Sequence, residues 1–119
     1  MAPYYQAVEA GVDTIMISYN SINGIKMHGS SYWINDVLKE ELGFDGFIVS
    51  DWNGIHQLPG IFYDQVVLSV NSGIDMLMEP YDWAVAIDMI VSAVDNFDIS
   101  VERINDAVRR ILTVKYERG

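Results

Sequence analysis

Asp51 and Trp52 follow the apolar run Phe47-Ile48-Val49, in a stretch with glycines at its flanks. A short apolar run of this composition predicts a buried strand, so the carboxylate and the indole would lie at the end of that strand. The tryptophan fits either core packing or stacking on a sugar ring or a nucleobase. The aspartate fits either a functional group or the cap of a following helix. These two residues are therefore the first candidates for a site.

Tyr19, Met78 and Glu79 also stand at or near the ends of apolar runs. Tyr19 has the same offset in its run as Asp51, so its hydroxyl is expected to reach that carboxylate. Met78 is expected to pack in the core or to form the floor of a pocket at the strand ends. Glu79 is a candidate second acid, but its offset matches Val49, which favours a salt bridge or a rim position over catalysis.

Lys26 and His28 follow the first predicted strand, and His56 follows the second. Two histidines this far apart lack a spacing of the His-x-x-x-His type, so they do not indicate a metal site. The sequence also has no glycine-rich phosphate loop and no Gly-x-Ser-x-Gly elbow, which argues against nucleotide and acyl chemistry. We expect neither a cofactor nor a metal.

Three segments that begin Gly-apolar-Asp can be superposed, and each runs through apolar residues into a polar or aromatic end. They are GVDTIMISY at 11–19, GFDGFIVSD at 43–51 and GIDMLMEPY at 73–81, with starts 32 and 30 residues apart. That spacing is the length of a βα unit, so each segment predicts one parallel strand. Asp13, Asp45 and Asp75 open the strands at the opposite end, where turn or capping roles are expected.

Helical patterns separate the strands, as parallel pairing requires. They are expected at about 4–10, 30–42, 63–72, 82–96 and 100–118. Ser30 and Ser31 offer an N-cap for the second of these helices, and Ser100 offers one for the last. Helical spacing predicts that the last helix buries Ile104, Ala107, Val108, Ile111 and Leu112.

The order of elements predicts an α/β fold with three buried parallel strands and covering helices. Three strands make a small sheet with open edges, and no earlier strand is present. We therefore interpret residues 1–119 as one partial domain, the last three βα units of a (β/α)8 barrel of the TIM type. The site is then expected at the carboxyl ends of the strands. Self-association through the open strand edges is also expected.

The 119 residues carry 17 acidic and 7 basic side chains, a formal net charge of −10. An acidic protein repels nucleic acid and anionic membrane surfaces, so neither is expected as a partner. Half of the residues are hydrophobic, which allows a sizeable core. No apolar stretch approaches the roughly 20 residues that span a bilayer, and the first residues do not form a signal-peptide pattern. The absence of cysteine leaves the compartment undecided.

Four stretches of the chain resemble glycoside hydrolase family 3, whose members are mostly β-glucosidases and related β-glycosidases. GFDGFIVSDWNGI at 43–55 is similar to the nucleophile segment of the family. MISYNSINGIKMH at 16–28 is similar to the preceding barrel strand and loop, and GIDMLMEP at 73–80 to the last strand. ISVERINDAVRRILTVKYERG at 99–119 is similar to the helix that closes the first domain. The resemblance covers nearly the whole chain.

The resemblance implies a carbohydrate substrate and retaining hydrolysis of terminal β-linked glucosyl or related residues from oligosaccharides or β-glucosides. Asp51 matches the catalytic nucleophile, and Trp52 matches a wall of the aglycone-side subsite. Tyr19 matches the tyrosine beside the nucleophile, and Met78 a methionine that lines the same pocket. The Lys-His pair and the general acid of the family have no counterpart in this sequence, so the isolated chain is expected to be inactive. The family also suggests an extracellular or periplasmic protein.

A phospho-receiver module is the alternative reading, with Asp51 as the phospho-acceptor. Its length is close to 119 residues, and an aspartate ends its central parallel strand. That class needs an acidic pair after its first strand and a lysine after its last. The sequence has Ser18-Tyr19-Asn20 and Glu79-Pro80-Tyr81 at those places, which favours the glycosidase.

Overall fold

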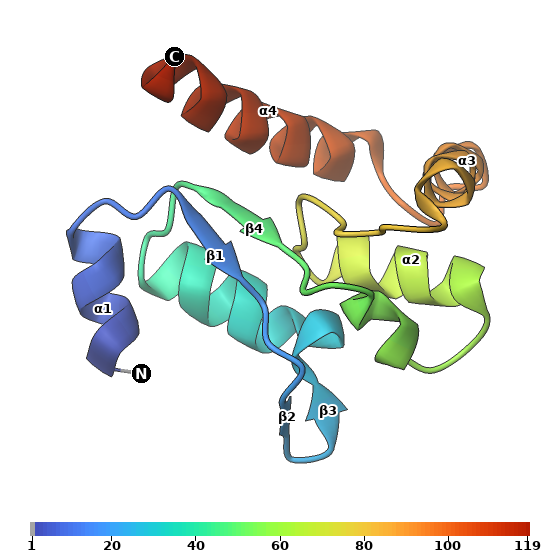
Figure 1. Ribbon diagram of the computed structural model, residues 1–119, viewed down its shortest axis with the longest axis horizontal. Helices are drawn as coiled ribbons and strands as arrows, with labels where there is room; N and C mark the ends of the chain where they lie inside the picture. Colours follow the sequence, from blue (N-terminus) through green and yellow to red (C-terminus); the bar gives the residue numbers. More distant parts are fainter. Residues whose placement is uncertain (1) are drawn as a thin grey trace.

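The structure is a computed structural model that describes residues 2–119. Helices and short strands alternate along the chain, and the two strands of the main sheet lie side by side near the middle of the molecule (Figure 1). The helices are α1 (Ala2–Glu9), a helix at Tyr32–Glu41, α2 (Phe62–Asn71), α3 (Trp83–Asp95) and α4 (Val101–Arg118), with short 3-10 helices at Met27–Gly29 and Gly54–Gln57. The strands are β1 (Thr14–Met16), β2 (Ser21–Ile22), β3 (Ile25–Lys26) and β4 (Phe47–Val49). The predicted α/β class and the five predicted helices are confirmed.

β1 and β4 pair in parallel, as predicted, but the third predicted strand at 73–81 is not a regular strand. That segment forms one parallel bridge, between Met76 and Val49. Its main chain stays close to β4, because Met76 N–H donates to the Ile48 carbonyl at 3.0 Å. The Ile48 N–H, however, donates to Oδ2 of Asp75 at 2.8 Å and not to a main-chain carbonyl. A side chain therefore occupies a place in the ladder that a regular strand would fill with backbone.

The strands are staggered relative to the repeat in the sequence. Equal offsets in the repeat would place Thr14 opposite Gly46, but Thr14 pairs with Phe47. In the same way, Val49 pairs with Met76, three residues short of the position that equal offsets give. Stagger between neighbouring strands accompanies the tilt that strands adopt in a barrel. The repeat thus predicts two of its three strands correctly, and equal offsets within the repeat do not give the register of their pairing.

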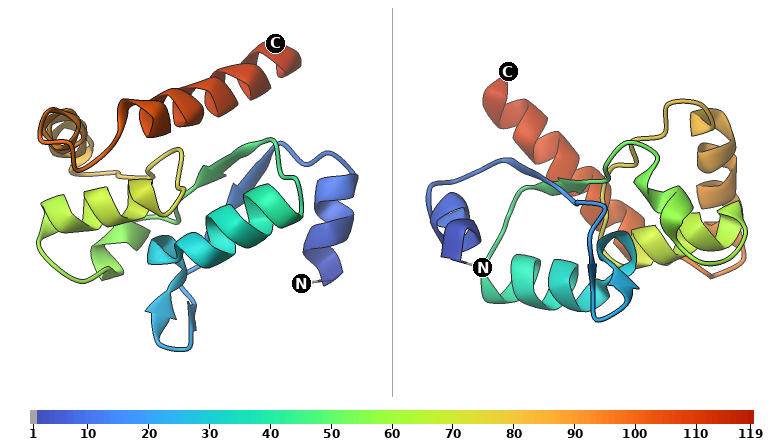
Figure 2. Two further views of the ribbon diagram at one scale, coloured as in Figure 1. Left: turned by 180° about the vertical axis from the view of Figure 1, so that it is seen from behind. Right: turned by 60° about the horizontal axis from the view of Figure 1, so that its bottom comes forward.

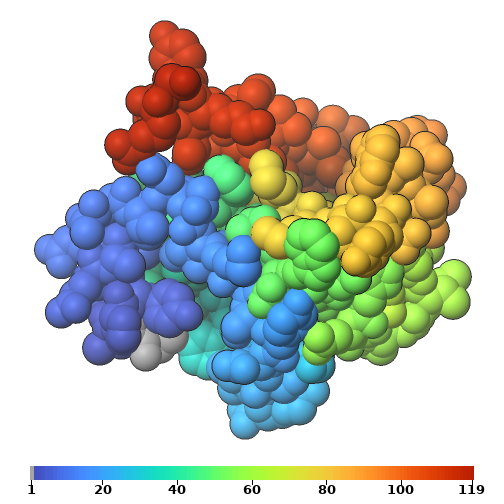
Figure 3. Space-filling view, viewed as in Figure 1, coloured from blue at the N-terminus to red at the C-terminus, as the bar shows by residue number. Residues whose placement is uncertain are grey.

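The loop after β1 contains an antiparallel hairpin of β2 and β3, where the sequence interpretation predicts no strand. Ser21 pairs with Lys26 across a two-residue turn. The turn residues Asn23 and Gly24 have φ angles of 52° and 82°. Asn-Gly is the residue pair best suited to such a turn, so the signal is present in the sequence. The hairpin projects from the body at the lower edge of Figure 3.

The helix at Tyr32–Glu41 has a buried face where one is expected but lacks the expected cap. Its hydrogen bonds are of the π type, as between Leu42 N–H and the Val37 carbonyl at 2.9 Å. Ser31 has helical backbone angles, and its side chain makes no capping hydrogen bond. The Ser31 hydroxyl instead accepts from the side-chain amide of Asn35 at 3.0 Å. The N-cap prediction for this helix was therefore wrong.

Buried apolar side chains from the strands and helices form one core. α2 lies beside α3 at the end of the molecule away from α1 (Figures 1 and 2). The buried residues of this core are Ile17, Ile34, Leu38, Phe44, Ile48, Ile55, Leu58, Val66, Val70, Ile74, Ala86, Ala93 and Ile99. This core supports the strand ends from which the candidate site projects.

α4 begins after Ser100, whose hydroxyl accepts from Arg103 N–H at 3.1 Å, so the predicted cap is confirmed. The predicted apolar face is only partly correct. Of its five residues only Ala107 is buried, whereas Leu112 is 58% exposed. The helix turns arginines toward the body instead: Nη1 of Arg110 donates to two main-chain carbonyls before β4, at 2.9 and 3.0 Å.

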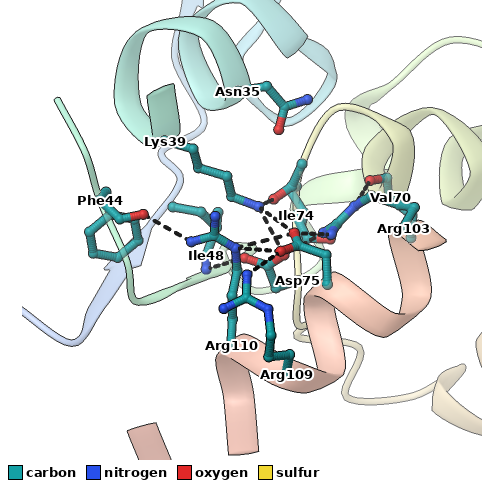
Figure 4. A network of polar contacts seen from close by, with 12 residues as sticks. Asn35, Lys39, Phe44, Ile48, Val70, Ile74, Asp75, Arg103, Arg109 and Arg110 are labelled. Carbon is teal, nitrogen blue, oxygen red and sulfur yellow. Dashed lines mark hydrogen bonds and ion pairs between the residues drawn. The ribbon is translucent and has the colours of Figure 1, made fainter. Parts of the chain in front are cut away.

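Asp75 lies at the centre of a buried ionic network (Figure 4). Its carboxylate is 0% exposed and pairs with Lys39 of the helix at Tyr32–Glu41 and with Arg103 of α4. The expected turn or capping role was therefore wrong for this residue, since two helices and the adjoining strand enclose its side chain. Asp13, at the equivalent position of the repeat, pairs with Arg118 near the surface.

Candidate active site

Asp51 directly follows β4 and Ser50, at the carboxyl end of the sheet, as predicted. Its Oδ1 atom accepts the N–H of Trp52 at 2.7 Å. Its own N–H donates to Nε2 of His28 at 3.0 Å, and its carbonyl accepts from Gly54 N–H at 2.9 Å. The main chain is therefore held on both sides of the carboxylate.

Tyr19 lies beside Asp51, although β1 and β4 are staggered by one residue relative to the repeat. Its hydroxyl donates to the carbonyl of Trp52, and the carboxylate of Asp51 also lies within hydrogen-bonding reach of the phenol, as expected. Partial loss of hydration, and then the negative charge of Asp51, raise the pKa of Tyr19 above its ordinary value. The phenol thus stays protonated and keeps its proton for donation.

Trp52 presents its indole to solvent at the strand end, with 52% of the residue exposed. It packs edge-to-face with Tyr81, at a centroid distance of 6.4 Å and an interplanar angle of 90°. Trp52 is therefore not a core residue. An exposed aromatic pair next to a carboxylate offers an apolar face on which a ring can stack.

Met78 belongs to the segment beside β4, and its main chain is tied to residues on both sides of Asp51. Its N–H donates to the buried hydroxyl of Ser50 at 2.7 Å. Its carbonyl accepts from Asn53 N–H at 3.2 Å. The four predicted site residues, Tyr19, Asp51, Trp52 and Met78, thus occupy one end of the sheet.

Glu79 is not a neighbour of Asp51 in any hydrogen bond of the site. Its Oε2 atom lies 2.9 Å from Nε2 of His56, and its side chain is 2% exposed. The ring of His56 also stacks on Phe62, at a centroid distance of 4.5 Å. The contact with His56 fits the preference for a salt-bridge or rim role of Glu79.

Two supporting residues of the site were not predicted from the sequence. His28, considered only as a candidate metal ligand, is 1% exposed and bonds the main chain of Asp51. Gln65 of α2 was not a candidate, and its amide donates to the carbonyls of His56, Leu58 and Gly60 at 3.3, 2.8 and 3.2 Å. These bonds fix the loop that follows Asp51. Neither contact has a local sequence signal, because each joins separate elements.

Residues 1–114 match the family model of the glycosyl hydrolase family 3 N terminal domain. The chain belongs to glycosyl hydrolase family 3. It is 39% identical over 121 aligned residues to Beta-glucosidase 1 of Saccharomycopsis fibuligera, covering 96% of this chain and 13% of that protein. A second relative, Probable beta-glucosidase L of Emericella nidulans, is 37% identical, over 98% of this chain and 16% of the relative.

Solved structures of the family have the same fold. An exo-1,3/1,4-beta-glucanase from a Pseudoalteromonas species superposes with a TM-score of 0.95 at 42% identity, over 99% of this chain and 15% of the glucanase. A beta-N-acetylglucosaminidase of family 3 from a Paenibacillus species gives a TM-score of 0.83 at 31% identity, over 98% and 24%. The chain thus spans about a quarter or less of the length of these proteins.

The described part of this family 3 chain contains no cluster of metal ligands. Among residues 2–119, no three His, Asp or Glu side chains gather closely enough to hold a metal ion. Over the same residues, no helix has the length and apolar character needed to cross a bilayer.

Proposed function

We propose that residues 1–119 supply the nucleophile half of a retaining β-glycosidase site that removes terminal β-linked glucosyl or related residues. The observation that carries this proposal is the position of Asp51, at the carboxyl end of β4, beside the Tyr19 hydroxyl and the exposed indole of Trp52. Active sites of barrel enzymes form at that end of the strands. Membership of family 3 favours glycoside hydrolysis over phospho-receiver signalling.

In the first step a carboxylate oxygen of Asp51 attacks the anomeric carbon of the sugar. The bond from that carbon to the leaving oxygen breaks, and a general acid protonates the leaving oxygen. In the second step water attacks the same carbon, the former acid takes the proton from the water, and the ester to Asp51 breaks. The general acid, about 5–5.5 Å from the nucleophile in retaining enzymes, comes from outside residues 1–119.

The neighbours of Asp51 serve this chemistry in four ways. The Trp52 N–H holds one carboxylate oxygen at 2.7 Å, which fixes the orientation of the attacking group. The Trp52 indole gives the sugar an apolar face on which its C–H groups lose water. Tyr19 carries a phenol with a raised pKa, which can donate to the carboxylate or to a sugar hydroxyl. Met78 is proposed to line the same sugar pocket, as the family resemblance implies.

The substrate is proposed to be a β-glucoside. Relatives named as β-glucosidase and exo-1,3/1,4-beta-glucanase are 39% and 42% identical to this chain. The beta-N-acetylglucosaminidase is 31% identical. A neutral sugar also suits a chain with a net charge of −10, because it needs no basic side chains for recognition.

We propose further that the chain forms the last three βα units of a (β/α)8 barrel. A groove of about 480 Å³ runs beside β1 and is lined by apolar side chains that include Ile15, Met16 and Trp33. A second groove, of about 250 Å³, borders the segment beside β4 and includes Leu77 and Trp83. Both grooves fit the faces that further barrel strands would cover. In isolation, these faces would favour self-association.

One carboxylate oxygen of Glu79, which lines the second groove, also supports the proposal of further barrel strands. Its Oε1 atom is buried and has no hydrogen-bond partner within residues 2–119. Buried carboxylate oxygens are almost always hydrogen-bonded in folded proteins. A donor from a further barrel strand would satisfy this oxygen.

The proposed role of Asp51 as nucleophile can be tested in a chimera in which residues 1–119 replace the matching segment of the Pseudoalteromonas glucanase. The TM-score of 0.95 indicates that the backbones are interchangeable. A fluoro-sugar β-glucoside that traps the glycosyl-enzyme should add its mass to the peptide that contains Asp51. Asp51→Ala should lower kcat by about 10⁴-fold or more, because the covalent step is lost.

Asp45→Ala is the matched control, since Asp45 is an exposed carboxylate at the other end of the sheet. It should leave kcat and labelling unchanged. Full turnover by the Asp51→Ala chimera, or labelling of another residue, would remove the basis for the proposed function.

A further inference from the structure

His28 is almost fully buried beneath the turn that carries Asp51, and the chemistry proposed above does not use it. The residue is 1% exposed and lies in the short helix Met27–Gly29, directly after the β2–β3 hairpin. Its Nε2 atom accepts the main-chain N–H of Asp51 at 3.0 Å. A buried, polar and titratable ring therefore contacts the backbone of the proposed nucleophile.

The direction of this hydrogen bond fixes the chemical form of the ring. A backbone N–H can only donate, so Nε2 must be unprotonated and the neutral ring carries its proton on Nδ1. Burial is the main influence on His28 and lowers its pKa, which favours this neutral form. The charge of Asp51 opposes that effect, and the charge of Lys26 adds to it.

The ring also fixes the shape of the turn by contact. A β-carbon at Gly54 would lie 2.2 Å from Nε2 of His28, so only glycine allows the turn to sit this close to the ring. The Gly54 N–H donates to the Asp51 carbonyl at 2.9 Å and closes the turn. The imidazole therefore packs directly against the turn from Asp51 to Gly54 and limits the positions that this turn can adopt.

The contact replaces a bond that the sheet does not provide. The preceding Ser50 N–H still donates to a main-chain carbonyl, that of Met76, at 3.0 Å. At Asp51 the ladder has ended, and the acceptor is the side chain of His28. Without this acceptor the partly buried amide would lose its hydrogen bond, which favours the observed position of the turn against the ring.

We propose that His28 is a positioning residue, whose neutral imidazole fixes the main-chain amide of Asp51 and thereby aims the carboxylate for attack. The inference rests on the proposed function for its catalytic consequence. Protonation of Nε2 would place two donors face to face and release the amide. His28 therefore links the geometry of the nucleophile to pH. The charged and titratable groups around the ring are Asp51, Lys26 and Tyr19, the last with its ring centroid 6.1 Å away.

The ring form can be tested by NMR on the 119-residue chain with ¹⁵N-labelled histidine. In an Asp51→Asn background, in which no carboxylate titrates at position 51, Nε2 of His28 should give the signal of an unprotonated nitrogen at neutral pH. On acidification the amide signal of residue 51 should move with the same midpoint as the His28 ring. His28→Gln should abolish this movement, because glutamine offers an acceptor and does not titrate. His56→Gln is the matched control and should leave the movement in place.

The catalytic consequence can be tested in the glucanase chimera. His28→Leu removes the acceptor and should lower kcat about 100-fold with less than about a threefold change in KM, because misplacement of a reacting group by about 1 Å has an effect of this size. His28→Gln restores an acceptor and should recover at least about tenfold of that loss. A ring that only fills space would predict equal losses for both variants.

The two proposals fail separately. The role of His28 would be overturned by any of three results. They are a proton on Nε2 at neutral pH, an amide signal of residue 51 that does not move when His28 titrates, and equal kcat values for the His28→Leu and His28→Gln variants. None of these results affects labelling of Asp51 by the fluoro-sugar. Full turnover by the Asp51→Ala chimera would instead overturn the proposed function, whatever form the His28 ring takes.

Discussion

The ammonium group of Lys39 lies 2.9 Å from Oδ1 of Asp75, and neither side chain is more than 7% exposed. Arg103 of α4 reaches the same carboxylate oxygen, so one anion joins two helices to the segment beside β4 (Figure 4). This network lies at the amino end of the strands, opposite Asp51. Changes there should therefore affect stability without touching the residues of the site.

Asp75→Asn should destabilise the chain strongly. The substitution removes the fully buried anion between Lys39 and Arg103 and leaves them only the partly exposed Asp106 as a charged partner. Breaking a buried pair on one side costs about 3–5 kcal/mol. Asp13→Asn is the matched control from the same position of the repeat. Its partner Arg118 has a side chain that is 64% exposed, so the loss should be no more than about 1 kcal/mol. Denaturant unfolding of both variants gives the comparison, and equal losses would contradict a special role for Asp75.

Lys39 should make stability rise with pH above neutrality. Burial, opposed by Asp75, lowers the pKa of Lys39 from 10.5 to about 8. Between about pH 8 and pH 10.5, Lys39 is protonated in the unfolded chain and neutral in the folded chain. Raising the pH in this range therefore stabilises the folded chain. From about pH 8 to about 9.5, before tyrosines ionise, the free energy of unfolding should increase by about 2 kcal/mol.

Lys39→Met supplies the control for this pH effect. Methionine keeps the apolar length of the side chain and cannot titrate, while Arg103 still neutralises Asp75. Denaturant unfolding at several pH values should therefore show a rise in the wild-type chain that the variant lacks. A rise of equal size in both proteins would assign the effect to another group.

Features that are encoded over short distances could be predicted from the sequence. Apolar runs ending in polar residues placed β1, β4 and the site end of the sheet, and helical spacing placed all five helices. The strand ends marked Asp51, Trp52, Tyr19 and Met78 as candidates, and the resemblance to family 3 then assigned them roles in a site. Local pattern carries this information because strand and helix periodicity persist whatever the partners are.

Features that depend on contacts between distant elements could not be predicted. The register of β1 against β4 is set by packing, and the hydrogen bond from the Tyr19 hydroxyl to the Trp52 carbonyl joins residues 33 positions apart. The burial of Asp75 depends on two helices far away in the chain. In α4 the exposed position of Leu112 goes with arginines that bind backbone carbonyls, which a hydrophobic repeat does not reveal.

Tyr19 should ionise at higher pH than an ordinary tyrosine, and Asp51 should be part of the reason. Loss of hydration and the negative charge of Asp51 both raise the pKa of Tyr19. Asp51→Asn removes the charge and leaves the packing in place, so the pKa should fall toward its ordinary value without reaching it. NMR titration of ¹³C-labelled tyrosine measures this directly. Tyr63, whose pKa is also raised and which bonds Asp98, is the internal reference and should not respond.

Gly54→Ala should destabilise the chain by pressing a methyl group against the ring of His28. The added carbon would lie 2.2 Å from Nε2, and overpacking of this kind costs about 1–3 kcal/mol. Gly11→Ala is the comparison, because its φ of 76° strains the alanine backbone by about 1–2 kcal/mol while nothing lies within 4 Å of the new carbon.

The two glycine substitutions can be separated by their response to His28→Ala. Removing the ring should abolish most of the cost at Gly54 and none of it at Gly11, since only the first cost arises from the imidazole. Denaturant unfolding of the single and double variants measures the coupling between the two positions. Additive losses for Gly54→Ala and His28→Ala would show that the turn does not rest on His28, because two residues in direct contact should not contribute independently to the free energy of unfolding.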